Sequence, residues 1–258
     1  MLDQIQLGRY ADVLLWGLRT ARGQRFKKGD IILVRYHAAA LGLAEIIHRR
    51  LLAMGMHPVM RLSLTPTMEK DFYALADSRQ LVFHAPGDLE LFRNLNGSIY
   101  LHAPESITHL SDADPKKIGR HAVSLKPFRD IMDKRDADGL FSWTLCMLPT
   151  EELARHAQLS LEQYTRQIVK ACWLHRRDPV SQWNRIYKDA QAVKRWLNAM
   201  SVSRFHIESD HTDLVVTPGD RRRWIGISGH NIPSFEVFLS PDWRGTKGNA
   251  SARMDMCR

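Results

Sequence analysis

Between residues 29 and 101 the chain alternates short apolar runs with helical patterns, and this alternation limits the possible fold more than any other feature. Gly29–Tyr36 is a turn followed by a continuous apolar run, as a buried parallel strand requires. Ala38–Met54 repeats apolar residues at helical spacing and ends at Gly55, a residue suited to a helix C-terminus. Pro58–Leu62 has the pattern of a second strand. The segment therefore predicts a β-α-β unit with parallel strands.

Two further rounds of helix and strand follow this unit. The first is a predicted helix over Met68–Asp77 with a strand over Gln80–His84. The second is a predicted helix over Asp88–Leu95 with a strand over Ser98–Leu101. Repeated alternation of this kind predicts an α/β fold with a mainly parallel sheet and flanking helices.

The region from residue 116 to residue 200 is predominantly helical. Lys116–Asp136 predicts one helix, bent near Pro127, and Ser142–Met147 predicts a further buried strand. Three more helices are predicted from their capping residues: one over Leu153–Gln158 after Thr150, one at Ser160 with Gln163 in a capping box, and one from Asp178-Pro179 to about Met200.

After this helical region the pattern changes to that of half-exposed strands. Ser203–Ser209 and Thr212–Thr217 alternate polar and apolar residues, which is typical of antiparallel strands. We therefore place a domain boundary near Met200. Residues 1–200 are predicted to form an N-terminal α/β domain, and residues 201–258 the antiparallel beginning of a second, incomplete domain.

The charge of the chain raises the possibility of a nucleic-acid partner. The formal net charge is +9, which is typical of many nucleic-acid-binding domains. The positive residues are nevertheless dispersed in pairs and one triplet, and no run reaches the five or six like charges of a binding tail. A basic nucleic-acid-binding module is therefore kept as an alternative and is disfavoured.

Cysteine usage and hydropathy indicate the cellular compartment. The three cysteines, Cys146, Cys172 and Cys257, form no C-x-x-C motif and are odd in number, which favours reduced thiols in the cytoplasm. No run approaches the ~20 apolar residues that cross a bilayer, and the N-terminus lacks the long apolar segment of a signal peptide. We expect a cytoplasmic protein with no membrane partner.

Glu236 is the candidate site residue. It lies on a short apolar strand with a proline on either side, at Pro233 and Pro241, so its carboxylate is expected at a strand end. Carboxylate oxygens are ligands for divalent cations, but a catalytic metal needs at least three protein ligands. The pattern alone favours the simpler interpretation of a glutamate that faces solvent.

The segment around Glu236 resembles the metal-ligand segment of the M29 family of thermophilic metallo-aminopeptidases. The matching residues are Asn231, Pro233, Glu236, Val237, Phe238, Pro241 and Asp242. Further segments resemble the family in the same order: Trp143-Thr144-Leu145, Pro149–Ala154, Leu159–Tyr164 and Asp178–Trp183. The resemblance covers most of the chain and is most specific after Phe141.

The resemblance implies a function as well as a fold. Glu236 would be the first glutamate ligand of a centre with two divalent ions, with cobalt, zinc and magnesium as the candidate metals. The ions would activate a water that removes N-terminal amino acids from peptides. The family also implies a homodimer. Cofactor and substrate are therefore expected to be divalent metal ions and peptides.

The chain departs from the family after this segment. Family members continue with a second glutamate, two histidines, an aspartate and a catalytic tyrosine, and residues 248–258 do not resemble that continuation. We therefore interpret the chain as an N-terminal fragment of an aminopeptidase with little activity of its own. The alternative is a non-catalytic α/β remnant that binds a partner.

The fragment interpretation makes two structural predictions. Residues 245–258 should be poorly ordered and should not pack on the core, because they offer few apolar side chains. Glu236 should be exposed. The apolar residues of the unfinished domain should be partly uncovered as well, namely Phe205, Val215, Trp224 and Phe238.

Other reactive residues are better explained without a catalytic role. His206 and His211 lie in the densest cluster of histidines and aspartates, yet surface positions beside a turn explain them better than a metal site. His230 adjoins the Glu236 segment and is expected to pack or hydrogen-bond, with lining of the site as the weaker alternative. Cys146 and Cys172 are expected to be packed thiols.

Overall fold

The computed structural model describes residues 2–250, which form two compact units. The first unit contains residues 2–180 together with Gly229–Pro233, and the second contains Ser181–Ser228 together with the described residues from Ser234 onward. The predicted domain boundary near Met200 stays a prediction. No helix within the described part of the chain is both long enough and apolar enough to cross a membrane.

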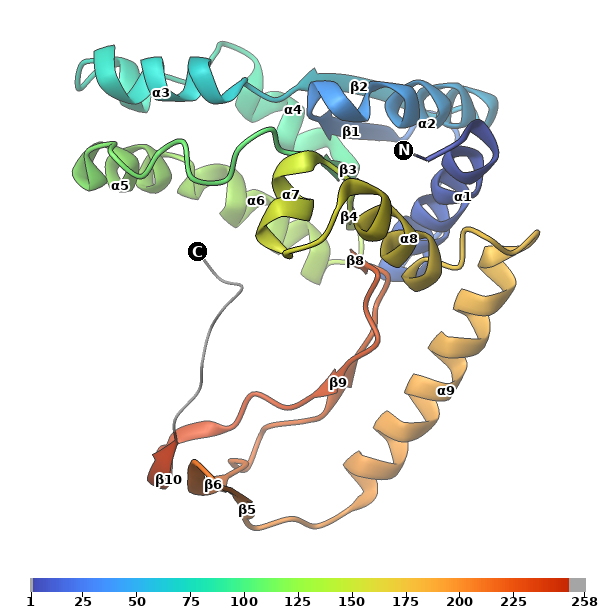
Figure 1. The fold of residues 1–258 in the computed structure, drawn as a ribbon, viewed down its shortest axis with the longest axis vertical. Helices are drawn as coiled ribbons and strands as arrows, with labels where there is room; N and C mark the ends of the chain where they lie inside the picture. The colour runs from blue at the N-terminus through green and yellow to red at the C-terminus, as the bar shows by residue number, and fades with distance from the viewer. Residues whose placement is uncertain (1, 251–258) are drawn as a thin grey trace. The chain divides into compact units, whose positions relative to one another are not determined.

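A five-stranded parallel sheet forms the centre of the first unit (Figure 1). Its order is β2-β1-β3-β4-β8, and every neighbouring pair is parallel. The strands are β1 (Ile31–Tyr36), β2 (His57–Leu62), β3 (Leu95–His102), β4 (Trp143–Met147) and β8 (Asn231–Ile232). The predicted α/β fold with a parallel sheet and flanking helices is confirmed.

Helix α1 (Gln4–Ala21) has no counterpart in the sequence predictions. Asp3 caps its first turn in a capping box, and almost every residue from Tyr10 to Leu18 is buried. The helix is enclosed because it packs on β3 and β4 and also against α2 (Leu41–Ala53). The polar residues Asp12 and Arg19 lie at exposed positions, so the segment carries a helical pattern that the sequence predictions missed.

Helices cover both faces of the sheet. On one face, Leu18 of α1 lies against Ile32 and Gly97. On the opposite face, the buried residues Leu33, Leu95 and Phe141 form a cluster. Partly buried residues from α4 (Asp88–Asn94) and α6 (Lys126–Ala137) pack against this cluster. A sheet buried on both faces explains the continuous apolar runs of its strands.

The predicted strand over Gln80–His84 is wrong. The structure has a short 3₁₀ helix there, η2 (Gln80–Val82). The Asp77 carboxylate accepts hydrogen bonds from the backbone N–H groups of Arg79 and Gln80, which favours a turn. Val82 and Phe83 are exposed, so the segment has no face to bury in a sheet.

Most of the remaining helices of the first unit begin at polar capping residues, and the caps predicted at Thr150 and Ser160 are confirmed. The helix predicted over Lys116–Asp136 is split at Leu125 into α5 (Pro115–Ser124) and α6, beside the expected bend at Pro127. Thr65, Thr150 and Ser160 accept capping hydrogen bonds at the next helices. These helices are α3 (Pro66–Leu75), α7 (Glu151–His156) and α8 (Leu161–Ala171).

The second unit consists of the long helix α9 (Pro179–Ala199) and short antiparallel strands. The strand pairs are β5 (Phe205–Ser209) with β6 (Thr212–Thr217), β6 with β10 (Asp242–Ala250), and β7 (Ile225–Gly226) with β9 (Val237–Phe238). The predicted antiparallel character of this region is confirmed.

The prediction of poor order after Gly245 is wrong for residues 245–250, which belong to strand β10. Lys247 and Gly248 pair with Val215 and Leu214 at the edge of β6. An open strand edge is joined through backbone hydrogen bonds and requires few apolar side chains. Gly248 is needed there because its φ is +115° and an added Cβ would lie 2.2 Å from the Asp213 carbonyl oxygen. Residues 251–258 lie outside the described residues.

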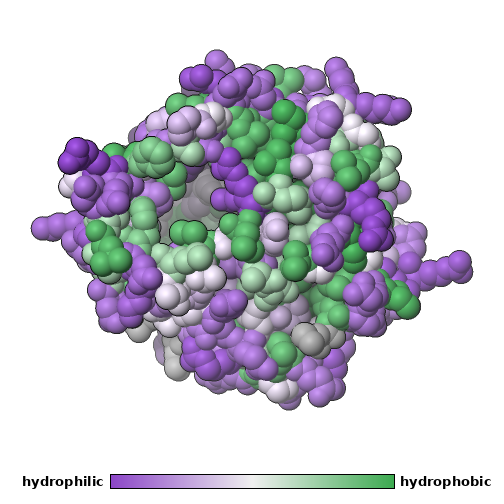
Figure 2. All heavy atoms as spheres, turned by 90° about the horizontal axis from the view of Figure 1, so that it is seen from above, coloured by the Kyte–Doolittle hydropathy of each residue, from purple (hydrophilic) through white to green (hydrophobic). Residues whose placement is uncertain are grey.

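One face of the surface mixes side chains of different hydropathy. On the face shown in Figure 2, hydrophilic side chains spread widely, and smaller hydrophobic groups lie between them.

Candidate functional site

Glu236 lies in the second unit, between β8 and β9, and is exposed. Its Oε2 atom accepts a hydrogen bond of 2.6 Å from Ser234 Oγ and one of 3.1 Å from the backbone N–H of Phe235. The carboxylate is therefore held against its own turn. The predicted exposure of Glu236 is confirmed.

The predicted exposure of the neighbouring apolar residues is also confirmed. Phe205, Val215 and Trp224 are half-buried, and Phe238 is 41% exposed. Phe205 and Trp224 pack edge to face, with ring centroids 5.8 Å apart. These side chains form a loosely covered layer.

The described residues do not by themselves fit a catalytic metal centre. No group of three or more histidine, cysteine, aspartate or glutamate side chains within residues 2–250 is arranged to hold a metal ion. One carboxylate that already accepts two hydrogen bonds does not provide the three ligands required. The role of Glu236 as a metal ligand remains a prediction.

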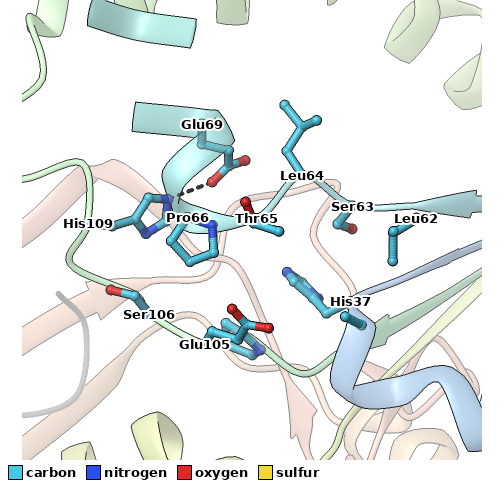
Figure 3. A pocket seen from close by; sticks show the side chains of 12 residues that line it. His37, Leu62, Ser63, Leu64, Thr65, Pro66, Glu69, Glu105, Ser106 and His109 are labelled. Carbon is cyan, nitrogen blue, oxygen red and sulfur yellow. Dashed lines mark hydrogen bonds and ion pairs between the residues drawn. The ribbon is translucent and has the colours of Figure 1, made fainter. Parts of the chain in front are cut away.

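A second polar site lies at the carboxyl ends of the strands in the first unit (Figure 3). Ligands of open parallel sheets bind at this edge. Its lining residues come from the loops after β1, β2 and β3, and they include His37, Ser63, Glu69 and His109. The cavity measures only about 30 Å³, the share of one water in the liquid. Its most prominent contact joins His109 Nε2 to Glu69 Oε2 at 2.6 Å.

Three aromatic side chains stand next to this cavity. The rings of His37, Tyr100 and His102 lie 5.3–5.7 Å apart, and His102 Nδ1 is 3.2 Å from the Tyr100 hydroxyl. Burial lowers the pKa of His102, and the charge of His37 lowers it further. A neutral imidazole at this edge can both donate and accept hydrogen bonds. The sequence signal for this cluster is polar residues directly at the ends of predicted strands.

His230 belongs to the first unit. Its ring stacks on Trp143 with a centroid distance of 4.4 Å and an interplanar angle of 18°. Burial lowers the pKa of His230, and the charge of Asp136 acts in the opposite direction. The expected packing role of His230 is therefore confirmed.

The remaining candidates follow the simpler interpretations. His206 Nε2 lies 2.8 Å from Asp213 Oδ1 on the exposed hairpin, and His211 is exposed beside them. Cys146 and Cys172 are buried. Burial raises the pKa of the Cys172 thiol to about 12, so this thiol is protonated and is a poor nucleophile.

Comparisons with known proteins find one family and individual relatives. The model of a family described as thermophilic metalloprotease (M29) matches residues 3–258. Aminopeptidase PepS from Streptococcus thermophilus is 25% identical over 154 residues, which cover 54% of this chain and 37% of that protein.

A solved structure also matches the fold. Wild-type AmpT from Thermus thermophilus matches with a TM-score of 0.70 and 18% identity, over 93% of this chain and 63% of that chain. The chain therefore spans less than two thirds of the length of either relative.

Proposed function

The chain belongs to the M29 family of metalloproteases, and we propose that it takes part in metal-dependent removal of N-terminal amino acids from peptides. The observation that carries this proposal is the family match over residues 3–258. The similarity to a protein named as an aminopeptidase supports the exopeptidase class. The proposed substrates are peptides, and the proposed location is the cytoplasm.

We propose Glu236 as a ligand of one of two divalent ions, with cobalt, zinc and magnesium as the candidate metals. Such ions polarise a carbonyl and lower the pKa of a bound water. Exposure of Glu236 supports the proposal, since a ligand carboxylate must be reachable. The hydrogen bonds from Ser234 and Phe235 support it too, because groups behind a metal ligand fix its orientation.

No three-residue ligand group is found within residues 2–250. We therefore propose that the other ligands come from outside this range. The 258-residue polypeptide by itself is then expected to have little activity, because most of the ligands that hold the ions are missing from it. The homodimer implied by the family is proposed for the whole enzyme.

The activity of this polypeptide is tested with leucine p-nitroanilide in the presence of Co²⁺, Zn²⁺ or Mg²⁺. We expect hydrolysis close to the uncatalysed background. Glu236→Gln is compared with Glu208→Gln, which changes another exposed glutamate of the second unit. Robust turnover that only Glu236→Gln abolishes would contradict the expected inactivity, while supporting the role of Glu236. Robust turnover that survives both substitutions would contradict the role of Glu236.

A further inference from the structure

A cavity of about 260 Å³ lies within the first unit, between the sheet and helix α6. Arg35, Tyr100 and Leu145 line it from three neighbouring strands and pair with one another in register, so they lie on one face of the sheet. Met132 and Asp136 line it from α6. The site is thus built from regular secondary structure rather than from loops.

Charged side chains of both signs line this cavity without pairing. Arg35 forms no ion pair among the residues described, and its guanidinium lies over the Tyr100 ring at 5.0 Å. The carboxylates of Asp133 and Asp136 likewise make no ion pair or hydrogen bond with any described residue. Arg35 and Asp133 are exposed, whereas Asp136 is half-buried.

The unpaired state of Asp136 carries an energetic cost. Burial raises the pKa of Asp136; the charge of His230 lowers it and that of Asp133 raises it. A half-buried carboxylate without a partner is unfavourable, and a bound cation relieves that cost. Arg35 is exposed, so burial imposes no such cost on it, but its positive charge in the cavity lining attracts an anionic group.

The rest of the cavity wall is apolar. Trp143, Phe141 and Met132 line it, and Phe141 is almost fully buried. Stacking on His230 holds the Trp143 ring in place. An apolar wall between a cation and two anions matches a small zwitterion with an apolar side chain.

We propose that this cavity binds a free α-amino acid with an apolar side chain. Arg35 pairs with the α-carboxylate, Asp136 and Asp133 with the α-ammonium, and Trp143 contacts the side chain. The volume equals that of roughly nine waters at ~30 Å³ each, below the ~300–1,000 Å³ of drug-sized ligand sites. It therefore accepts a single amino acid rather than a peptide. The proposal stands independently of the peptidase function, although free amino acids are also products of that reaction.

The test is a calorimetric titration of the 258-residue chain with L-leucine in the presence of a metal chelator. We expect saturable binding of leucine. L-leucinamide lacks the carboxylate and N-acetyl-L-leucine lacks the ammonium group, and each should bind at least tenfold more weakly. Because the chelator removes metal ions and no turnover is measured, failure of the peptidase proposal does not affect the result.

Two substitutions assign the charged contacts. Arg35→Met should weaken leucine at least tenfold and leave leucinamide unchanged, whereas Asp136→Asn should weaken leucine and leave N-acetyl-leucine unchanged. Arg93→Met and Asp138→Asn change the same residue types on α4 and at the end of α6, outside the cavity lining, and should have no effect. Thermal unfolding verifies that each variant is folded. Absence of leucine binding by the folded wild type, or equal affinity in all four variants, would overturn the proposal.

Discussion

The two units of the molecule use different means to hold their strands. In the first unit the sheet is buried on both faces, and α1 and α2 supply a dense core that includes Leu14 and Ile47. In the second unit the strands are antiparallel and half-exposed. The buried apolar side chains described there are Trp183, Val216 and Ile227. The difference shows that side-chain burial specifies the first sheet, whereas backbone pairing contributes most of the order in the second unit.

The largest expected effect is on the core of the first unit. Leu14 is fully buried, so Leu14→Ala should lower the free energy of unfolding by about 2–5 kcal/mol. Ile207 is 49% exposed on β5, so Ile207→Ala should cost below about 1 kcal/mol. Urea unfolding followed by circular dichroism measures both values. An equal loss of unfolding free energy from the two substitutions would contradict the claim that side-chain burial matters more in the first unit than in the second.

A glycine pair tests how closely β8 is fitted to the first unit. Gly229 has φ +90°, and an added Cβ would lie 2.4 Å from the Gly17 carbonyl oxygen. Gly29 has φ +86° with open space around it. Gly29→Ala should lower the free energy of unfolding by about 1–2 kcal/mol, the cost of a left-handed backbone at an alanine. Gly229→Ala should lower it by more, because its Cβ would also clash with Gly17. Chemical unfolding of both variants compares the costs, and the reverse order would contradict this account of β8.

A smaller effect concerns pH. Burial lowers the pKa of His102 and His230, so the unfolded chain binds more protons than the folded chain between the lowered values and ~6.5. The stability of the first unit should therefore fall as pH drops below about 6.5. Thermal unfolding across this range measures the dependence. The double variant His102→Gln, His230→Gln should show a flatter profile, and an unchanged profile would rule out these two histidines as its source.

The sequence predicts the parallel sheet because each strand and helix between Ile31 and Leu101 carries its own local pattern, and capping residues such as Ser160 mark helix starts. Prediction fails where order depends on distant partners. Strand β8 is only two residues long, and β10 is held by the edge of β6.

The same distinction applies to the sites. Glu236 is found through a local motif that resembles a family, although its surroundings within residues 2–250 do not complete a metal centre. Arg35 and Asp136 are about a hundred positions apart and have no common local pattern. Only the register of the strands and the placement of α6 bring them to one cavity.

The central claim is that Glu236 is a metal ligand of a metal-dependent aminopeptidase. Peptide hydrolysis by the chain joined to residues that supply the other proposed metal ligands tests this claim most directly. With Co²⁺ or Zn²⁺ we predict release of N-terminal residues from short peptides, an activity that a chelator removes. Glu236→Gln should reduce kcat/KM at least a hundredfold, which corresponds to about 2.7 kcal/mol of transition-state stabilisation, and Glu208→Gln should leave it unchanged. Full activity in Glu236→Gln, or no hydrolysis by the metal-loaded wild type, would contradict the account.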